Sequence, residues 1–182
     1  LATIHEALFE VRHKFNIGCV FETIDLFNTT LKEYFHIENP KIGVAALNPY
    51  AGEEGQFGDE EQRIISPAIL LAQEQGINCC GPFPADTLFM HAVQGEFDAV
   101  VAMYHDQGMI PVKLLHFEQA VNITMGIPII RTSPAHGTAF DIAGKNIANP
   151  ASMKAAILTA IQMAKTKKCM VAQEQNSVSK LR

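Results

Sequence analysis

The chain has no tryptophan, only three tyrosines, and no apolar run long enough to cross a bilayer. A membrane span needs about 20 consecutive apolar residues, and the N-terminus shows no secretory signal pattern. We therefore expect no membrane partner and a cytoplasmic protein. Basic residues are also few, 14 against 19 acidic ones, for a formal net charge of −5. No basic stripe alternates with aromatic residues, so nucleic acid is not an expected partner.

Cysteine is scarce and its spacing is uninformative. The chain has four cysteines, of which Cys79 and Cys80 are neighbours, and none forms a Cys-x-x-Cys pair. This pattern excludes the common zinc motifs and favours reduced structural thiols. The chain also lacks an initiator Met and starts inside what looks like a strand, so we expect a piece of a longer protein. Its 182 residues, 48% hydrophobic, suffice for a substantial core in one domain or in parts of two.

Chemically capable side chains follow directly after an apolar run. Ala99–Met103 has the length of a buried parallel strand and is followed by Tyr-His-Asp-Gln-Gly at 104–108. In open α/β sheets, ligands bind beyond the carboxyl ends of the strands. His105 and Asp106 are therefore candidates for binding a metal or moving a proton. The alternative is that His105 is a hydrogen-bonded loop histidine.

Two other segments show the same pattern. Ile42–Leu47 is a second strand-like run that leads into Tyr50, and Leu1–Ile4 resembles the end of a strand followed by His5. We expect strands ending near residues 4, 47 and 103, with His5, Tyr50 and His105 at one sheet edge, in one subunit or shared between two. Helical periodicity at 22–36, after Asp59 and after Asn149-Pro150 alternates with these strands. Asp59 is expected to cap the second of these helices, and Pro67 is expected to kink it. The last of these helices is expected to turn Met153, Ala156, Ile157, Ala160 and Ile161 inward. This alternation predicts an α/β fold with a mostly parallel sheet.

Two further features have both a functional and a structural interpretation. The Asn48–Gly58 loop has glycines at 52, 55 and 58, which either let backbone amides approach an anion or simply form a tight turn. Lys113, Asn122 and Arg131 follow one another at intervals of nine residues, and both cations lie in apolar surroundings. These cations either hold a carboxylate or phosphate or extend to solvent.

Five motifs together resemble the 4-hydroxythreonine-4-phosphate dehydrogenase family of vitamin B6 synthesis. They are Asn-Pro-Tyr-Ala-Gly-Glu at 48–53, Gly-Pro-Phe-Pro-Ala-Asp-Thr-Leu-Phe at 81–89, Tyr-His-Asp-Gln-Gly at 104–108, Val-Asn-Ile-Thr-Met-Gly-Ile-Pro at 121–128 and Arg-Thr-Ser-Pro-Ala-His-Gly-Thr-Ala at 131–139. The resemblance implies an isocitrate/isopropylmalate dehydrogenase-like, three-layer αβα fold whose N-terminal segment is missing. It implies a metal-binding and dimerising domain over residues 1–128. Residues 129–182 would belong to a second, discontinuous domain that carries the NAD-binding loop.

The same resemblance implies the site residues. A divalent metal (Zn, Mg or Co) would be held by His5, His105 and position 50, where the family has histidine and this chain has Tyr50. A neutral phenol is a poor metal ligand. Substrate contacts would fall on Lys113, Asn122 and Arg131. The adenosine end of NAD or NADP would contact the loop at 134–150 through His136, Gly137, Thr138, Asp141 and Asn149. Asp141 has an alternative role as the cap of a turn.

The implied reaction is the oxidation and decarboxylation of 4-phosphooxy-L-threonine to 3-amino-2-oxopropyl phosphate by a homodimer with a shared active site. Lys113 or Asp106 would relay the hydroxyl proton, and the sequence does not choose between them. One alternative is a dehydrogenase of the same type that acts on 4-phosphothreonate or 4-phosphoerythronate. Another is a degenerate, non-catalytic fragment that still dimerises, an interpretation favoured by Tyr50 and by the missing segment.

Overall fold

The computed structural model describes residues 1–180, with side chains described up to residue 169, and divides into two compact units. The first unit contains Leu1–Lys32 and Ile37–Pro111, and the second contains Glu33–His36 and Val112–Arg182. The change of unit thus falls inside a helix, before the boundary expected at residue 128. The assignment of metal binding and dimerisation to 1–128, and of NAD binding to 129–182, stays a prediction. Residues 181–182 lie outside the described residues.

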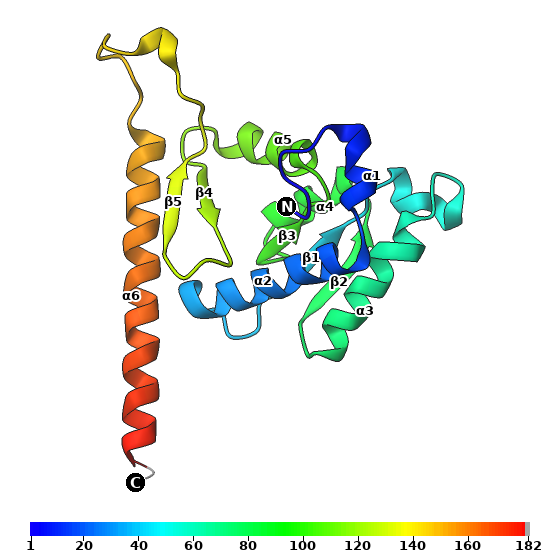
Figure 1. Cartoon of the computed structure of the whole chain (residues 1–182), viewed down its shortest axis with the longest axis horizontal. Coiled ribbons are helices and arrows are strands. Elements are labelled where there is room, and N and C mark those ends of the chain that lie inside the picture. The colour runs from blue at the N-terminus through cyan, green and yellow to red at the C-terminus, as the bar shows by residue number, and fades with distance from the viewer. Residues whose placement is uncertain (181–182) are drawn as a thin grey trace. The chain divides into compact units, whose positions relative to one another are not determined.

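The first unit is built on a three-stranded parallel sheet with the order β2-β1-β3 (Figure 1). Its strands are β1 (Ile42–Ala45), β2 (Cys79–Phe83) and β3 (Ala99–Val101). Every residue of the central strand β1 is buried, as expected for a parallel strand covered on both faces. The predicted α/β fold with a parallel sheet is confirmed.

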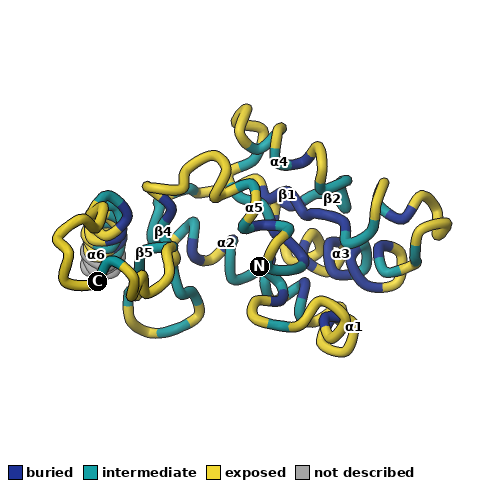
Figure 2. Tube along the Cα trace, turned by 90° about the horizontal axis from the view of Figure 1, so that it is seen from above, coloured by how far each residue is buried: buried dark blue, intermediate teal, exposed yellow. Residues whose placement is uncertain are grey.

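Helices cover both faces of this sheet. On one face, α2 (Ile17–Phe35) and α3 (Ser66–Glu74) contribute Val20, Ile24 and Ile69 to a core that includes Ile42 and Val44 of β1. On the other face, α4 (Ala85–Val93) presents the buried Leu88 to Gly43, where an added Cβ would lie 3.0 Å from the Leu88 side chain. Figure 2 shows α3 and α4 on opposite sides of β1. The unit therefore has three layers.

The helix after the glycine-rich loop begins differently from the sequence expectation. The Asp59 carboxylate pairs with Arg63, and the N-cap position falls on Glu60, whose side chain makes no capping hydrogen bond. A single wide turn, η3 (Glu61–Ile65), precedes α3, and Pro67 lies at the start of α3. Proline lacks the N–H for an α-helical bond and its ring crowds the preceding turn. The kink expected at Pro67 therefore takes the form of a π turn.

The N-terminal residues lie along the end of β3 without forming a strand of their own. The Ala2 amide donates to the Ala102 carbonyl at 2.8 Å, and the Thr3 amide donates to the Met103 carbonyl at 3.1 Å. The strand expected to end near residue 4 is thus present only as this hydrogen-bonded extension. Next come η1 (Leu8–Glu10) and α1 (Val11–Lys14), while β3 leads into α5 (His105–His116).

The second unit contains an antiparallel hairpin, β4 (Val121–Thr124) and β5 (Arg131–Pro134), packed against the long helix α6 (Ala151–Lys180). Asn149 caps α6, since its Oδ1 accepts the Ala151 amide at 2.9 Å. The short helix η4 (Phe140–Ile142) lies in the connecting loop. No helix in the described part of the chain is long and apolar enough to span a membrane.

The inward face expected for α6 is only partly correct. Ala156 is buried against the hairpin, where the Thr132 hydroxyl donates to its carbonyl at 2.9 Å. Met153, Ile157 and Ile161 are instead between 45% and 53% exposed. A two-stranded hairpin covers only a narrow strip of a helix, so in this chain the rest of the apolar stripe faces solvent.

The β1–β2 pairing generates the first testable prediction. Register shifts between Gly43 and Ala45, and Gly81 at this irregularity has φ +143°, with Val44 O closer than 3.0 Å to any added Cβ. Gly81→Ala should therefore lower the free energy of unfolding by about 2–4 kcal/mol through backbone displacement and strain. Gly76→Ala is the matched control, because Gly76 also has positive φ but no atom within 4 Å of its Cβ position. Urea unfolding of the two variants checks this, and equal losses would contradict it.

Candidate functional site

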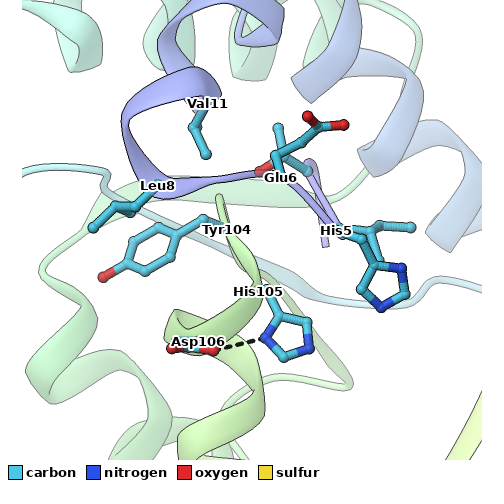
Figure 3. Close-up of a pocket in the computed structure, with 9 residues that line it drawn as sticks. His5, Glu6, Leu8, Val11, Tyr104, His105 and Asp106 are labelled. Atoms are coloured by element: carbon cyan, nitrogen blue, oxygen red, sulfur yellow. Dashed lines mark hydrogen bonds and ion pairs between the residues drawn. The ribbon is translucent and has the colours of Figure 1, made fainter.

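Two predicted site histidines meet at the carboxyl edge of the parallel sheet. His5 follows the N-terminal extension and His105 begins α5 directly after β3. Their ring centroids are 5.7 Å apart, with the ring planes tilted by 41°. Both line a pocket of about 330 Å³ (Figure 3), whose other lining residues are Thr3, Ile4, Glu6, Leu8, Val11, Tyr104 and Asp106. The structure therefore places two imidazoles side by side where α/β sheets bind ligands.

Asp106 orients the His105 ring. Its Oδ1 lies 2.7 Å from His105 Nδ1, drawn as the dashed line in Figure 3. An ionised carboxylate only accepts hydrogen bonds, so this contact assigns the proton of the neutral imidazole to Nδ1 and leaves the lone pair on Nε2 available. This arrangement, in which a carboxylate holds an imidazole through its second nitrogen, is typical of metal-ligating histidines.

Gln107 and Gly108 hold this part of the backbone together, roles that sequence reasoning missed. Gln107 Oε1 accepts the Met103 amide and its Nε2 donates to the Ala46 carbonyl, both at 2.7 Å. The side chain thus connects the residues that follow β1 with those that follow β3. At Gly108 an added Cβ would lie 2.6 Å from the Leu1 side chain and 3.2 Å from that of Ala102. Glycine therefore lets α5 approach the N-terminal segment.

Tyr50 has a different environment. It is 66% exposed and packs against Phe57 with ring centroids 5.9 Å apart. It does not line the pocket that His5 and His105 share. In the part of the chain that the structure describes, no group of three or more His, Cys, Asp or Glu side chains is arranged to hold a metal ion. Within one chain, the structure brings together two of the three predicted ligand positions, and the role of Tyr50 stays a prediction.

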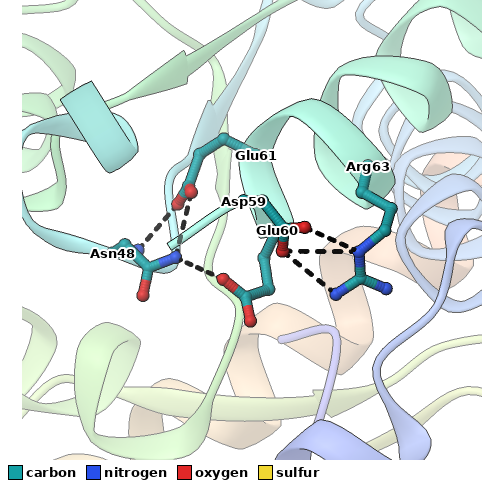
Figure 4. Close-up of polar contacts among 5 residues, drawn as sticks. All are labelled: Asn48, Asp59, Glu60, Glu61 and Arg63. Carbon is teal, nitrogen blue, oxygen red and sulfur yellow. Dashed lines mark hydrogen bonds and ion pairs between the residues drawn. The ribbon is translucent and has the colours of Figure 1, made fainter. Parts of the chain in front are cut away.

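The loop that carries Tyr50 is held by a buried carboxylate that the sequence analysis did not single out. Glu61 is 3% exposed, and its Oε1 accepts the amides of Leu47 and Asn48 at 2.8 and 2.7 Å. Its Oε2 accepts Asn48 Nδ2 at 3.0 Å, and the same nitrogen donates to Glu60 (Figure 4). A glutamate soon after a glycine-rich loop was the only signal in the sequence.

The predicted substrate residues lie in the second unit. Asn122 faces Ser133 and Thr124 faces Arg131 across the hairpin, so alternation places Asn122 and Arg131 on the same face. Arg131 is exposed, and its Nη1 donates to the Thr124 hydroxyl at 2.6 Å. Lys113 is exposed on α5. Convergence of Lys113 with the other two stays a prediction.

The predicted cofactor loop is exposed. His136 Nδ1 contacts the Gly137 carbonyl at 2.9 Å, and Thr138 precedes the left-handed residue Ala139. Asp141 lies in the first turn of η4, whose N-cap position is held by Ala139, so Asp141 is not the N-cap of this turn. Asn149 caps α6 and donates through Nδ2 to Glu118 at 3.0 Å. The cofactor role of these residues stays a prediction.

The sheet, its covering helices and the site at its carboxyl edge define an α/β protein with a candidate ligand site where its parallel strands end. Residues 1–160 match the family model described as pyridoxal phosphate biosynthetic protein PdxA. The chain belongs to the PdxA family.

Named relatives agree with this assignment. A 4-hydroxythreonine-4-phosphate dehydrogenase of Geobacter metallireducens is 58% identical over 167 residues, which make up 92% of this chain and 49% of the relative. A relative from Oceanobacillus iheyensis with the provisional name D-threonate 4-phosphate dehydrogenase is 53% identical over 166 residues, 91% of this chain and 50% of the relative. The chain thus spans about half the length of the curated relatives it matches.

Solved structures show the same fold. The 4-hydroxythreonine-4-phosphate dehydrogenase of Klebsiella pneumoniae matches with a TM-score of 0.81 and 43% identity, over 89% of this chain and 49% of that one. A terephthalate 1,2-cis-dihydrodiol dehydrogenase of Burkholderia xenovorans matches with a TM-score of 0.70 and 33% identity, over 87% of this chain and 50% of that one. The dehydrogenase-like fold expected from the sequence is confirmed.

The position of Gln107 generates the second prediction. Met103 and Ala46 are almost completely buried, so Gln107→Ala leaves a buried amide and a buried carbonyl without partners. Each such group costs about 1–3 kcal/mol, and we expect a loss of unfolding free energy of about 2–4 kcal/mol. Gln94→Ala is the control, because Gln94 is exposed at the end of α4. Chemical denaturation measures both, and a loss below about 0.5 kcal/mol for Gln107→Ala would contradict the bridging role.

Proposed function

We propose that this chain is part of a metal- and NAD(P)-dependent dehydrogenase that oxidises 4-phosphooxy-L-threonine, whose product then loses CO2 to give 3-amino-2-oxopropyl phosphate. The enzyme would act in the cytoplasm as a homodimer with a shared active site. The observation that carries the proposal is the His5–His105 pair, with Asp106 behind it, at the carboxyl edge of the sheet in a PdxA-family chain. Relatives named for this activity support it.

The donor set of the pocket fits a divalent metal in part. Two imidazoles 5.7 Å apart between ring centroids, one of them oriented by a carboxylate, offer two nitrogen ligands. The phenol of Tyr50 is a poor ligand while it keeps its proton. A bound metal would supply Lewis-acid polarisation of the substrate hydroxyl.

The remaining residues would bind substrate and cofactor. The Arg131 guanidinium suits the bidentate binding of a phosphate or carboxylate, and the Asn122 amide on the same hairpin face would orient the substrate. Either the Asp106 carboxylate, whose Oδ1 contacts His105, or the Lys113 amine in its neutral form would accept the hydroxyl proton. His136, Gly137, Thr138, Asp141 and Asn149 would contact the adenosine end of NAD or NADP.

A second candidate substrate is D-threonate 4-phosphate. The Oceanobacillus relative named for that substrate is nearly as similar, 53% identical against 58% for the Geobacter relative. Both substrates carry a phosphate, and each has a hydroxyl on the carbon that the enzyme would oxidise. The same substrate-binding and cofactor-binding residues would serve either substrate.

The test of substrate also tests Arg131. The chain is joined to the part of the Geobacter relative that it does not match, and NAD(P)H formation is followed with each substrate. Arg131→Ala should raise KM for the preferred substrate about 10-fold to 150-fold, since a lost charged hydrogen bond costs about 1.5–3 kcal/mol. Arg12→Ala, an exposed cation on α1, should leave KM unchanged. No oxidation of either substrate would contradict the proposed function, and an unchanged KM would limit Arg131 to a surface role.

The metal site is tested by zinc titration of the 182-residue chain. His5→Ala and His105→Ala should each weaken zinc binding about tenfold or more, whereas Tyr50→His should tighten it, because a third neutral imidazole completes a common first shell. His91→Ala serves as the control, since His91 pairs with Glu96 away from the pocket. Isothermal titration calorimetry gives the affinities. Equal zinc affinity of the Tyr50→His variant and the unmodified chain would show that position 50 contributes no ligand or that tyrosine already serves as one.

A further inference from the structure

Glu61 is a buried carboxylate that the proposed reaction does not use. It is 3% exposed, and none of the ion pairs found among the described residues includes it. Its partners are three N–H groups from two consecutive residues: the amides of Leu47 and Asn48, and Asn48 Nδ2. Figure 4 shows the Glu61 carboxylate directed toward Asn48 from the start of η3. Hydrogen bonds to an ionised acceptor are stronger than neutral ones.

These bonds lie where the chain leaves the sheet. The Ala46 amide is the last one bound by a neighbouring strand, since it donates to the Phe83 carbonyl at 2.7 Å. The next two amides, of Leu47 and Asn48, both donate to Glu61 Oε1. Because a partly buried amide needs an acceptor, Glu61 replaces the missing strand and fixes the direction in which the loop departs.

The loop then enters an unusual conformation. Tyr50, Ala51, Gly52, Glu53 and Glu54 all have φ between +40° and +78°. Four of the five carry a Cβ, for which left-handed backbone is unfavourable. Such a turn persists only when the surroundings over-determine it.

The Glu61 carboxylate also packs against this turn, at Gly52. A Cβ added at Gly52 would lie 2.7 Å from Glu61 Oε2 and 3.0 Å from the Gly58 carbonyl. One carboxylate thus binds the residues before the turn with one oxygen and packs against the middle of the turn with the other. Tyr50 lies between these two contact points in the chain.

We propose that Glu61 is a positioning residue: its carboxylate holds the loop at 48–58 in the left-handed turn and so fixes Tyr50 at the carboxyl edge of the sheet. The role of Tyr50 at that edge rests on the proposed function. The hydrogen bonds of Glu61 do not. Glu61 itself touches neither substrate nor metal, and it acts through the backbone that carries Tyr50.

Glu61→Gln separates this role from mere packing, because it keeps the shape of the side chain. One oxygen still accepts the Leu47 and Asn48 amides, but the new amide nitrogen faces Asn48 Nδ2, so two donors oppose each other. Combining Glu61→Gln with Asn48→Asp and Glu60→Gln reverses the polarity, since both new amides then donate to the new carboxylate. This combination is the rescue variant. Glu54→Gln is the matched control, because it removes one exposed carboxylate from the same loop.

The readout is ¹⁹F NMR of the chain labelled with 3-fluorotyrosine. The chain has three tyrosines, Tyr34, Tyr50 and Tyr104, so three resonances are expected. Tyrosine-to-phenylalanine variants assign the three resonances. Glu61→Gln should shift or broaden the Tyr50 resonance alone, the rescue variant should restore it, and Glu54→Gln should leave it in place. An unmoved Tyr50 resonance in Glu61→Gln overturns the proposal, as does a joint change of all three resonances, which would report general loosening. Asn48→Ala, which removes only the side-chain bonds, provides the same readout if Glu61→Gln does not fold.

Zinc titration connects the positioning role to the proposed function, and it is carried out in the Tyr50→His background because a neutral phenol is a poor ligand. There Glu61→Gln should weaken zinc binding about threefold or more, and the rescue variant should recover it. An unchanged zinc affinity beside a moved Tyr50 resonance removes position 50 from the metal site and leaves the placement of Tyr50 by Glu61 in force. If the unmodified chain binds no zinc while the NMR result holds, the proposed function fails and the placement of Tyr50 by Glu61 stands. If the chain binds zinc and Glu61→Gln changes neither signal, the positioning role fails and the proposed function stands.

Discussion

The structure of the site depends on how the central strand β1 ends. Ala46 is buried and the next two residues are partly buried, yet the chain must turn away from the sheet and leave the ladder that satisfied its amides and carbonyls. Two side chains from two different helices supply the missing partners: Gln107 binds the Ala46 carbonyl, and Glu61 binds the Leu47 and Asn48 amides. Without them the edge of the sheet would expose unpaired backbone groups to a dry environment. With them, the backbone at this edge of the sheet has a fixed conformation, and functional side chains extend from it.

Backbone support and chemistry are combined in one short segment. Within Tyr-His-Asp-Gln-Gly at 104–108, His105 faces the pocket, Asp106 orients its ring, Gln107 ties two strand ends together, and Gly108 lets α5 approach Leu1. Each residue depends on the others, because a displaced Gln107 would move the start of α5 and with it the His105 ring. A motif of this kind is restricted by structure and by chemistry together, which explains why it was the most informative stretch of the sequence.

The sequence predicted what depends on local pattern and strand order. Apolar runs that end in polar side chains located β1 and β3, and the rule that ligands bind at carboxyl ends anticipated that His5 and His105 would meet. It did not predict the left-handed turn at Tyr50–Glu54, because four of its five residues carry a Cβ and local propensity opposes the conformation. Nor did it predict Glu61, whose partners lie more than ten positions away and become visible only when the loop closes. The prediction that the whole apolar stripe of α6 faces inward was wrong for a related reason. Periodicity shows which face of a helix is apolar, but not what covers that face.

The same reasoning explains how position 50 can hold tyrosine in this chain. The turn is determined by contacts at its two sides, where Glu61 binds Asn48 and packs against Gly52, and not by the side chain of residue 50 itself, which is 66% exposed and touches Phe57. A backbone fixed from outside tolerates a change of side chain without refolding. Histidine and tyrosine at position 50 would therefore start from the same place on the sheet edge and differ in what they offer a ligand: an imidazole lone pair, or a phenol that must first lose its proton. The conformation of the loop and the chemistry of its exposed side chain are thus set by separate residues.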